Sequence, residues 1–150
     1  MKITTVLVTG AAGRISYSLI PILLSGSIFG SDVFIRLHLF DIKGILRFKM
    51  RFKNQILIRL LSTEAEVKLE GVKMEIIDSQ FDLLYEVIAS TTPELVFCNV
   101  DVAILLGGYP RLPGMERRDL ILKNAENIII QAKLLNSYGT PKTKVHAREK

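Results

Sequence analysis

Short apolar runs alternate along the chain with stretches in which apolar residues recur at helical spacing. Runs rich in β-branched residues predict buried strands at Ile3–Thr9, Val33–Phe40, Val87–Ala89 and Val102–Leu106. Helical spacing predicts helices at Gly13–Leu24, Glu66–Tyr85 and Glu116–Tyr138, with a single turn at Pro93–Cys98. Strands that alternate with helices favour an α/β fold, a parallel sheet with helices on both faces.

Local signals refine these boundaries. Pro21 should kink the first helix or mark its last turns, and the run from Tyr138 to Pro141 should end the last helix. Lys144 and Val145 begin like a further strand, but 146–150 turn polar, so we expect an aberrant tail there. The strand Val102–Leu106 would then be left as an unpaired apolar edge.

One interval does not fit the alternating pattern. Ile42–Glu70 separates the second strand from the next regular helix, whereas such connections usually run about 2–6 residues. We interpret its basic part, about 43–65, as an insertion. A membrane-surface patch and an RNA-binding arm are the functional alternatives to a loop without a role.

Charge and composition narrow the class of protein. The 150 residues carry a net charge of +5, but six basic residues and no acidic ones lie between Lys43 and Arg59, and the rest sums to −1. The fold itself therefore gives no reason to expect a nucleic-acid or membrane partner. No apolar run is long enough for a transmembrane helix and no signal-peptide layout is present, so we expect a cytoplasmic protein. Cys98, the only cysteine, should be a small buried residue.

The junction of the first strand and first helix carries the clearest chemistry. Gly10-Ala11-Ala12-Gly13 follows the strand, and Ser16 takes the place of the third glycine of a G-x-G-x-x-G turn. Such turns present backbone N–H groups to a pyrophosphate at a helix N-terminus, although some are ordinary tight turns. Asp41, at the end of the second strand, could accept both ribose hydroxyls and repel a 2′-phosphate, which favours NAD over NADP. The turn therefore predicts a Rossmann-type, doubly wound parallel sheet, incomplete at about four strands.

A second loop follows the strand Val102–Leu106. It carries Arg111, Arg117 and Arg118, and its course is set by glycines and prolines, namely Gly107, Gly108, Pro110, Pro113 and Gly114. Guanidinium groups on a loop beside a cofactor site suit bidentate binding of carboxylates, and two of them suit a dicarboxylate. A solvated loop with incidental arginines is the alternative.

Six segments together resemble the amino-terminal half of a malate dehydrogenase of the cytosolic type. They lie in family order over most of residues 3–145, and Gly-Met-Glu-Arg-Arg-Asp at 114–119 is the most specific of them. The others lie at 6–15, 26–30, 39–42, 71–76 and 101–107. The resemblance implies an NAD-binding domain over 1–145 and reversible hydride transfer between malate and NAD, with oxaloacetate as product.

The resemblance also implies roles for individual residues. The residues from Gly10 to Ser16 (Gly10, Ala11, Ala12, Gly13, Arg14, Ile15 and Ser16) would wrap the pyrophosphate, and Asp41 would hold the ribose. Arg111 would close over the distal carboxylate of malate or oxaloacetate, and Arg117 would be a second substrate-binding arginine. Asn124 and Gln131, on the last helix, match family positions near the cofactor. No metal site is expected.

Three departures from the family matter. The 42–70 stretch is much longer than in the family and enters the helix of the family's dimer contact, which puts the homodimer in doubt. Leu112 replaces a residue that is often basic. The family's general-base His, its partner Asp and a second domain have no counterpart in these residues, and His38 lies within a strand as a core histidine. We therefore expect no turnover from this chain alone.

Two other interpretations stay open. The chain could be a non-catalytic NAD-binding or interaction fragment. It could also be an extended short-chain dehydrogenase or epimerase, because Thr9–Gly13 fits that family's turn and Tyr138 with Lys142 fits its Tyr-x-x-x-Lys pair. The latter family has no use for the arginine loop.

Overall fold

A computed structural model describes residues 1–41, 55–109 and 113–148, with only the backbone described for 55–63. Strands and helices alternate from the first element to the last. In chain order they are β1 (Lys2–Thr9), α1 (Arg14–Leu24), β2 (Val33–Phe40), α2 (Gln55–Asp78), β3 (Leu84–Ser90), α3 (Pro93–Val96), β4 (Val102–Leu105), α4 (Arg117–Tyr138) and β5 (Lys144–Ala147). The predicted α/β class is confirmed.

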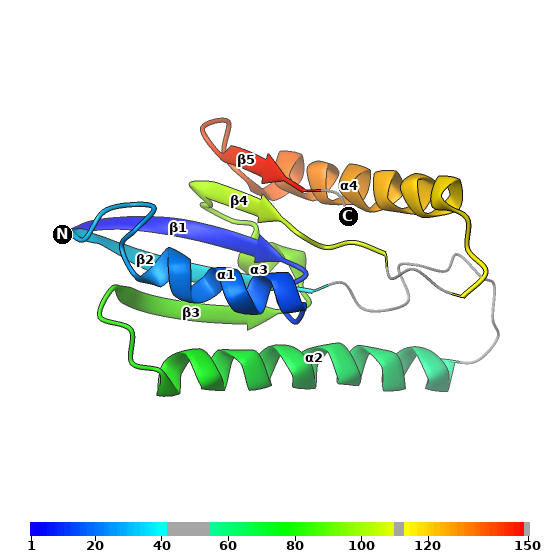
Figure 1. The fold of residues 1–150 in the computed structure, drawn as a ribbon, viewed down its shortest axis with the longest axis horizontal. Helices are drawn as coiled ribbons and strands as arrows, with labels where there is room; N and C mark the ends of the chain where they lie inside the picture. The colour runs from blue at the N-terminus through cyan, green and yellow to red at the C-terminus, as the bar shows by residue number, and fades with distance from the viewer. Residues whose placement is uncertain (42–54, 110–112, 149–150) are drawn as a thin grey trace.

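All strand pairs are parallel, and the sheet has the order β3-β2-β1-β4-β5 (Figure 1). The chain moves outward from β1 to β3, returns to β4 on the other side of β1, and so reverses direction between β1 and β4. In sheets wound in both directions, ligands bind at this reversal, outside the carboxyl ends of the strands.

The expectation of four strands with an unpaired edge at β4 is wrong. β5 pairs with β4 along its whole length, and the Arg148 N–H extends the pairing to the Leu105 carbonyl at 3.2 Å. All four residues of β5 are exposed. A strand pairs through its backbone, so polar side chains such as His146 do not exclude an edge strand. The polar residues at 146–150 therefore led to the wrong expectation of an aberrant tail.

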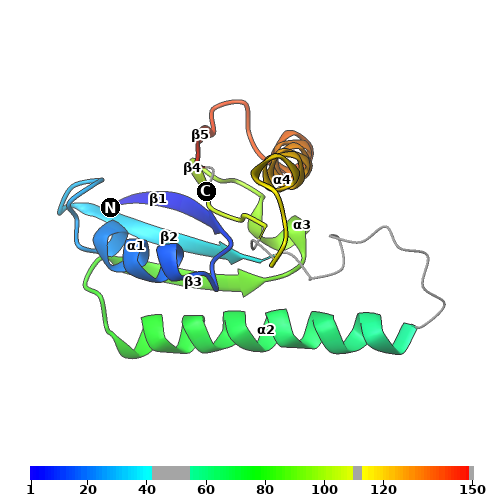
Figure 2. The ribbon, with the colours of Figure 1, turned by 45° about the vertical axis from the view of Figure 1, so that its right-hand side comes forward.

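The two faces of the sheet bury separate apolar clusters. Val6 and Val8 face α1 and α2, where they pack with Ile20, Leu23 and Leu24 of α1. Leu7 and Leu105 face α3 and α4, and there Phe97 packs its ring edge-on against Phe40 at 4.9 Å between centroids. Figure 2 shows the helices on both sides of the sheet. The alternation along β1 is the period-2 pattern of a strand buried on both faces.

The helix predicted at Glu66–Tyr85 begins and ends earlier. α2 begins at Gln55, so much of the stretch interpreted as an insertion is helical, and residues 42–54 lie outside the described residues. The helix ends at Asp78 because Leu84 already belongs to β3, which is longer than the predicted Val87–Ala89. α2 contacts the sheet through Leu69 and Ile76, whereas Val67 is 65% exposed. Val72 packs against the same cluster, so the inward side of this part of α2 runs through residues 69, 72 and 76.

Other predicted elements are confirmed within one or two residues. β1, β2 and β4 match the apolar runs, α3 is the single turn after Pro93, and α4 ends at Tyr138. Pro21 lies in the last turn of α1, where the helix ends three residues later. Cys98 is half-buried rather than buried.

Candidate functional site

The turn after β1 is held by its own backbone. Gly10 has φ +65°, a left-handed conformation that favours glycine. Its carbonyl accepts hydrogen bonds from the Gly13 N–H at 2.9 Å and from the Ser16 hydroxyl at 2.8 Å. α1 starts directly afterwards with Gly13 as its N-cap. The N–H groups of the first helical turn have no partner within a helix, so residues 14–16 are placed to donate to an anion.

Two backbones meet at the turn without space for a side chain. A Cβ on Gly10 would lie 2.8 Å from the Cα of Gly107, the residue that follows β4 and Leu106. A Cβ on Gly13 would lie 3.0 Å from the Gly10 carbonyl oxygen. Close backbone approach therefore requires a glycine at position 10, whereas a side chain at position 13 would need the Gly10 carbonyl to shift by a few tenths of an ångström.

Asp41 joins this edge of the sheet. The Ala11 N–H donates to the Phe40 carbonyl at 3.1 Å, so the turn lies beside the end of β2 where Asp41 follows. The Asp41 side chain is partly exposed. The turn, the carboxylate and Gly107 come from three segments far apart in sequence and meet at the carboxyl edge.

The arginine loop is described only in part. Arg111 lies outside the described residues, and Arg117 is exposed at the first position of α4. Tyr109 is the last described residue before 110–112, and the ammonium of Lys123 on α4 lies 4.4 Å from the centre of its ring. The bidentate clamp predicted from Arg111 and Arg117 stays a prediction.

Asn124 and Gln131 point inward from α4. Asn124 accepts the Tyr109 N–H at 2.6 Å, and Gln131 accepts the hydroxyl of Thr9 at 2.6 Å. Both amides therefore bind groups of the protein itself, one on the segment after β4 and one at the end of β1. Sequence reasoning had not singled out Thr9 for this role, nor Asn127, which is also buried on α4. The available signal was the spacing of the three amides at 124, 127 and 131, which places them on one helix face.

Two titratable side chains lie away from this edge. His38 is buried on β2 and its Nδ1 lies 2.8 Å from the Val96 carbonyl, so it is a core histidine as expected, although Nε2 has no partner among the described residues. Burial lowers the His38 pKa, and Arg36 lowers it further, against the hydrogen bond to Val96 and the charge of Glu86. Tyr138 donates to Glu94 at 2.7 Å, and this hydrogen bond raises its pKa. A catalytic tyrosine of the short-chain type would need the opposite shift.

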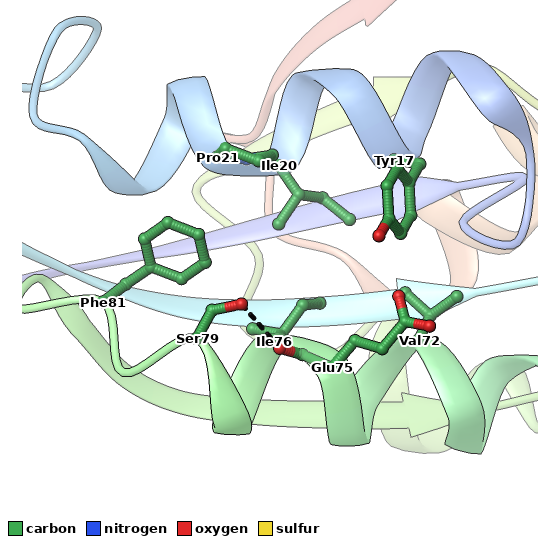
Figure 3. A pocket seen from close by; sticks show the side chains of 8 residues that line it. All are labelled: Tyr17, Ile20, Pro21, Val72, Glu75, Ile76, Ser79 and Phe81. Atoms are coloured by element: carbon green, nitrogen blue, oxygen red, sulfur yellow. Dashed lines mark hydrogen bonds between the residues drawn. The ribbon is translucent and has the colours of Figure 1, made fainter.

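A small cavity opens between α1 and α2, away from the glycine turn (Figure 3). The Tyr17 side chain lies opposite Glu75, and interaction with that carboxylate raises the Tyr17 pKa. The cavity holds about 90 Å³, far less than the roughly 300–1,000 Å³ of small-molecule sites. Its walls come from Tyr17, Ile20, Pro21, Val72, Glu75, Ile76, Ser79 and Phe81. It is a packing gap between two helices.

Neither a metal centre nor a membrane-spanning helix is found in the part of the chain that the structure describes. Over 1–41, 55–109 and 113–148, no three His, Cys, Asp or Glu side chains gather as metal ligands would. Over the same ranges, no helix combines the length and apolar character needed to span a membrane.

A parallel sheet of this order, with a glycine turn after its first strand, defines a Rossmann-type nucleotide-binding domain. Residues 4–146 match the model of the lactate/malate dehydrogenase NAD binding domain. The chain belongs to this family.

Three relatives illustrate the match. A cytoplasmic malate dehydrogenase from Zea mays is 38% identical over 140 residues, which is 93% of this chain and 36% of that protein. The crystal structure of a malate dehydrogenase from Naegleria fowleri is 33% identical with a TM-score of 0.78, over 98% of this chain and 39% of that one. A Trichomonas vaginalis lactate dehydrogenase in complex with NADH and oxamate is 30% identical with a TM-score of 0.73, over 96% and 37%. The chain thus spans little more than a third of each relative's length.

Proposed function

We propose that this chain is the NAD-binding part of a malate dehydrogenase, cytoplasmic like several of its named relatives and acting within the tricarboxylic acid cycle's malate–oxaloacetate step. The observation that carries the proposal is the meeting of the glycine turn, Asp41 and Gly107 at one edge of the sheet. Gly10, Gly13 and the first turn of α1 would hold the pyrophosphate, and Asp41 the adenosine ribose.

The cofactor, when bound, supplies the hydride chemistry. The chain's own contribution is to bind and orient. The N–H donors at the start of α1 would bind the phosphates, and the Asp41 carboxylate would accept hydrogen bonds from the vicinal hydroxyls of the ribose while repelling a 2′-phosphate. Arg117, with Arg111 of the undescribed loop segment, would bind the two carboxylates of malate or oxaloacetate. A loop closing over them would also exclude water from the reacting atoms.

Calorimetric titration with NADH and NADPH tests the cofactor assignment. The chain has no Trp, so protein-to-NADH energy transfer from Trp is not available as a signal. We expect NADH to bind at least about tenfold more tightly than NADPH, a difference of about 1.4 kcal/mol. Asp41→Ala should abolish that preference. Asp32→Ala, which removes a carboxylate just before the other end of β2, is the matched control and should preserve it.

Turnover is measured on the same sample. Reduction of oxaloacetate by NADH, beside reduction of pyruvate, separates a dicarboxylate from a monocarboxylate substrate. The proposal predicts that any turnover, in this chain or in a longer form containing it, favours oxaloacetate and weakens on Arg117→Gln. Equal binding of NADH and NADPH, or no binding of either, would refute the assignment of NAD as the cofactor.

A further inference from the structure

We propose that Thr9 and Gln131 act as a positioning pair that holds the glycine turn against the segment after β4 and so sets the affinity for NAD. The proposal rests on the proposed function. The pair joins the end of β1 to the middle of α4, across 122 residues of sequence. Neither residue is expected to touch the cofactor.

The Thr9 hydroxyl uses its full hydrogen-bonding capacity. It donates to Oε1 of Gln131 at 2.6 Å and accepts the N–H groups of Leu106 at 3.2 Å and Gly107 at 3.4 Å. A hydroxyl has one donor and two acceptor lone pairs, so all three are engaged. Thr9 and Gln131 are both 0% exposed, so no water competes for these bonds. The hydroxyl therefore ties three segments of the chain together.

The orientation of the Gln131 amide is determined by its other end. Nε2 donates to the Asn127 carbonyl at 3.3 Å, an atom that can only accept. Oε1 must then face Thr9 as an acceptor, which agrees with the hydroxyl donating to it. The pair consequently has a single arrangement.

Gly107 lies between this pair and the glycine turn. A Cβ built on Gly107 would lie 3.4 Å from Gln131 Nε2 and 3.5 Å from Thr9 Oγ1, and 3.5 Å from the Gly10 nitrogen on the turn. From the turn side, a Cβ on Gly10 would lie 2.8 Å from the Gly107 Cα. Gly107 is bonded to the Thr9 hydroxyl through its N–H, and its Cα lies against Gly10, so a displacement of the pair is passed to Gly107 and from Gly107 to the turn.

A second amide of α4 acts on the same segment. Asn124 accepts the Tyr109 N–H at 2.6 Å in a buried position. The inner face of α4 therefore holds the segment from Leu106 to Tyr109 at both ends. Losing the Thr9 hydroxyl alone would remove this partner from the buried Gln131 side-chain carbonyl, the buried Leu106 N–H and the partly buried Gly107 N–H, a state that drives a local shift.

Three variants of the whole chain test the proposal. Thr9→Val removes the hydroxyl at nearly constant shape, and Thr9→Ser keeps it. Thr5→Val makes the same change on the same strand and face, at a residue that is 5% exposed and remote from the turn. At a temperature where all are folded, we expect Thr9→Val to weaken NADH binding about tenfold or more, and the other two to stay within about twofold of the parent.

Amide hydrogen exchange without any cofactor supplies an independent readout. Thr9→Val should raise exchange at 10–13 and 106–109, whereas Thr5→Val should leave both segments unchanged. If Thr9→Val does not fold, Gln131→Met is measured in its place with the same expectation. Equal exchange in the Thr9 and Thr5 variants overturns the positioning pair. Failure of the parent chain to bind NADH overturns the proposed function, and the exchange data still decide whether the pair positions the turn.

Discussion

The helices α1 and α4 cover opposite faces of one sheet with opposite chemistry. α1 turns Ile20, Leu23 and Leu24 inward. α4 buries three amides and exposes apolar residues, namely Ile121, Leu122 and Ile129 at 49%, 57% and 53%. Only the second half of α4 packs apolar side chains, Leu134 and Leu135, against the sheet.

The difference follows from what each helix contacts. α1 lies on paired strands, whose backbone groups are satisfied within the sheet, so apolar side chains suffice. The first half of α4 lies on the segment after β4, where N–H groups such as that of Tyr109 have left the ladder and need acceptors. We infer that α1 contributes mainly to stability, and that α4 from Asn124 to Gln131 contributes mainly to the geometry of the site.

The largest loss of unfolding free energy is expected at Gly10, where the turn after β1 meets the backbone of Gly107. Gly10→Ala places a Cβ in a left-handed backbone and 2.8 Å from another backbone atom. Strain of about 1–3 kcal/mol and overpacking of about 1–3 kcal/mol predict a loss of roughly 2–6 kcal/mol of unfolding free energy. We also expect NADH binding to be lost, as measured by calorimetry.

Gly71→Ala is the matched control for Gly10. Gly71 lies within α2 with no atom near its ideal Cβ. The same substitution should raise the unfolding free energy there by roughly 0.5–1 kcal/mol, because alanine loses less entropy in a helix. If Gly10→Ala proved as benign as Gly71→Ala in urea unfolding, the close approach of the two backbones would be refuted.

The contrast between the helices is tested directly by one apolar truncation in each. Leu23→Ala in α1 removes a side chain that is 1% exposed and should cost about 2–5 kcal/mol. Ile129→Ala in α4 should change the unfolding free energy by no more than about 0.5 kcal/mol. Neither should alter NADH affinity once the protein is folded. A large loss for Ile129→Ala in urea unfolding would show that its face of α4 is covered in solution.

The sequence predicts the α1 side of the molecule better than the α4 side. Apolar runs and the two glycines of the turn are local signals, and they give β1, β2 and the turn within two residues. β5 was missed because an edge strand needs only backbone pairing. The start of α2 was missed because the basic stretch that leads into it was interpreted as an insertion. The bond from Thr9 to Gln131 spans 122 residues, so no local pattern reveals it.

A smaller change in unfolding free energy should come from His38, a buried side chain on the face of the sheet that α3 and α4 cover. Only one of its two ring nitrogens has a hydrogen-bond partner among the described residues. Burial lowers its folded pKa below the unfolded value of about 6.5, so below that pH the unfolded chain binds more protons. Unfolding free energy should therefore fall as pH drops from about 7 to 5, with a slope of at most about 1.4 kcal/mol per pH unit.

Urea unfolding of His38→Gln between pH 5 and pH 8 measures that slope. Glutamine can still donate to the Val96 carbonyl but does not titrate, so the slope should flatten. His146→Gln is the control, because it makes the same substitution at an exposed position on β5. An unchanged slope in His38→Gln would assign the pH dependence to other groups.

The smallest effect on stability is expected at Tyr138, the last residue of α4, at the opposite end of the helix from Arg117. Its hydroxyl donates to Glu94 on α3, and this bond joins two helices outside the site. Tyr138→Phe should lower Tm slightly and leave NADH affinity unchanged, because the ring still packs against the cluster that contains Phe97. Glu94→Gln should lower Tm to a similar extent, since it weakens the same bond. A loss of NADH affinity in Tyr138→Phe at full folding would contradict the division of α4 into a positioning part up to Gln131 and a packing part after it.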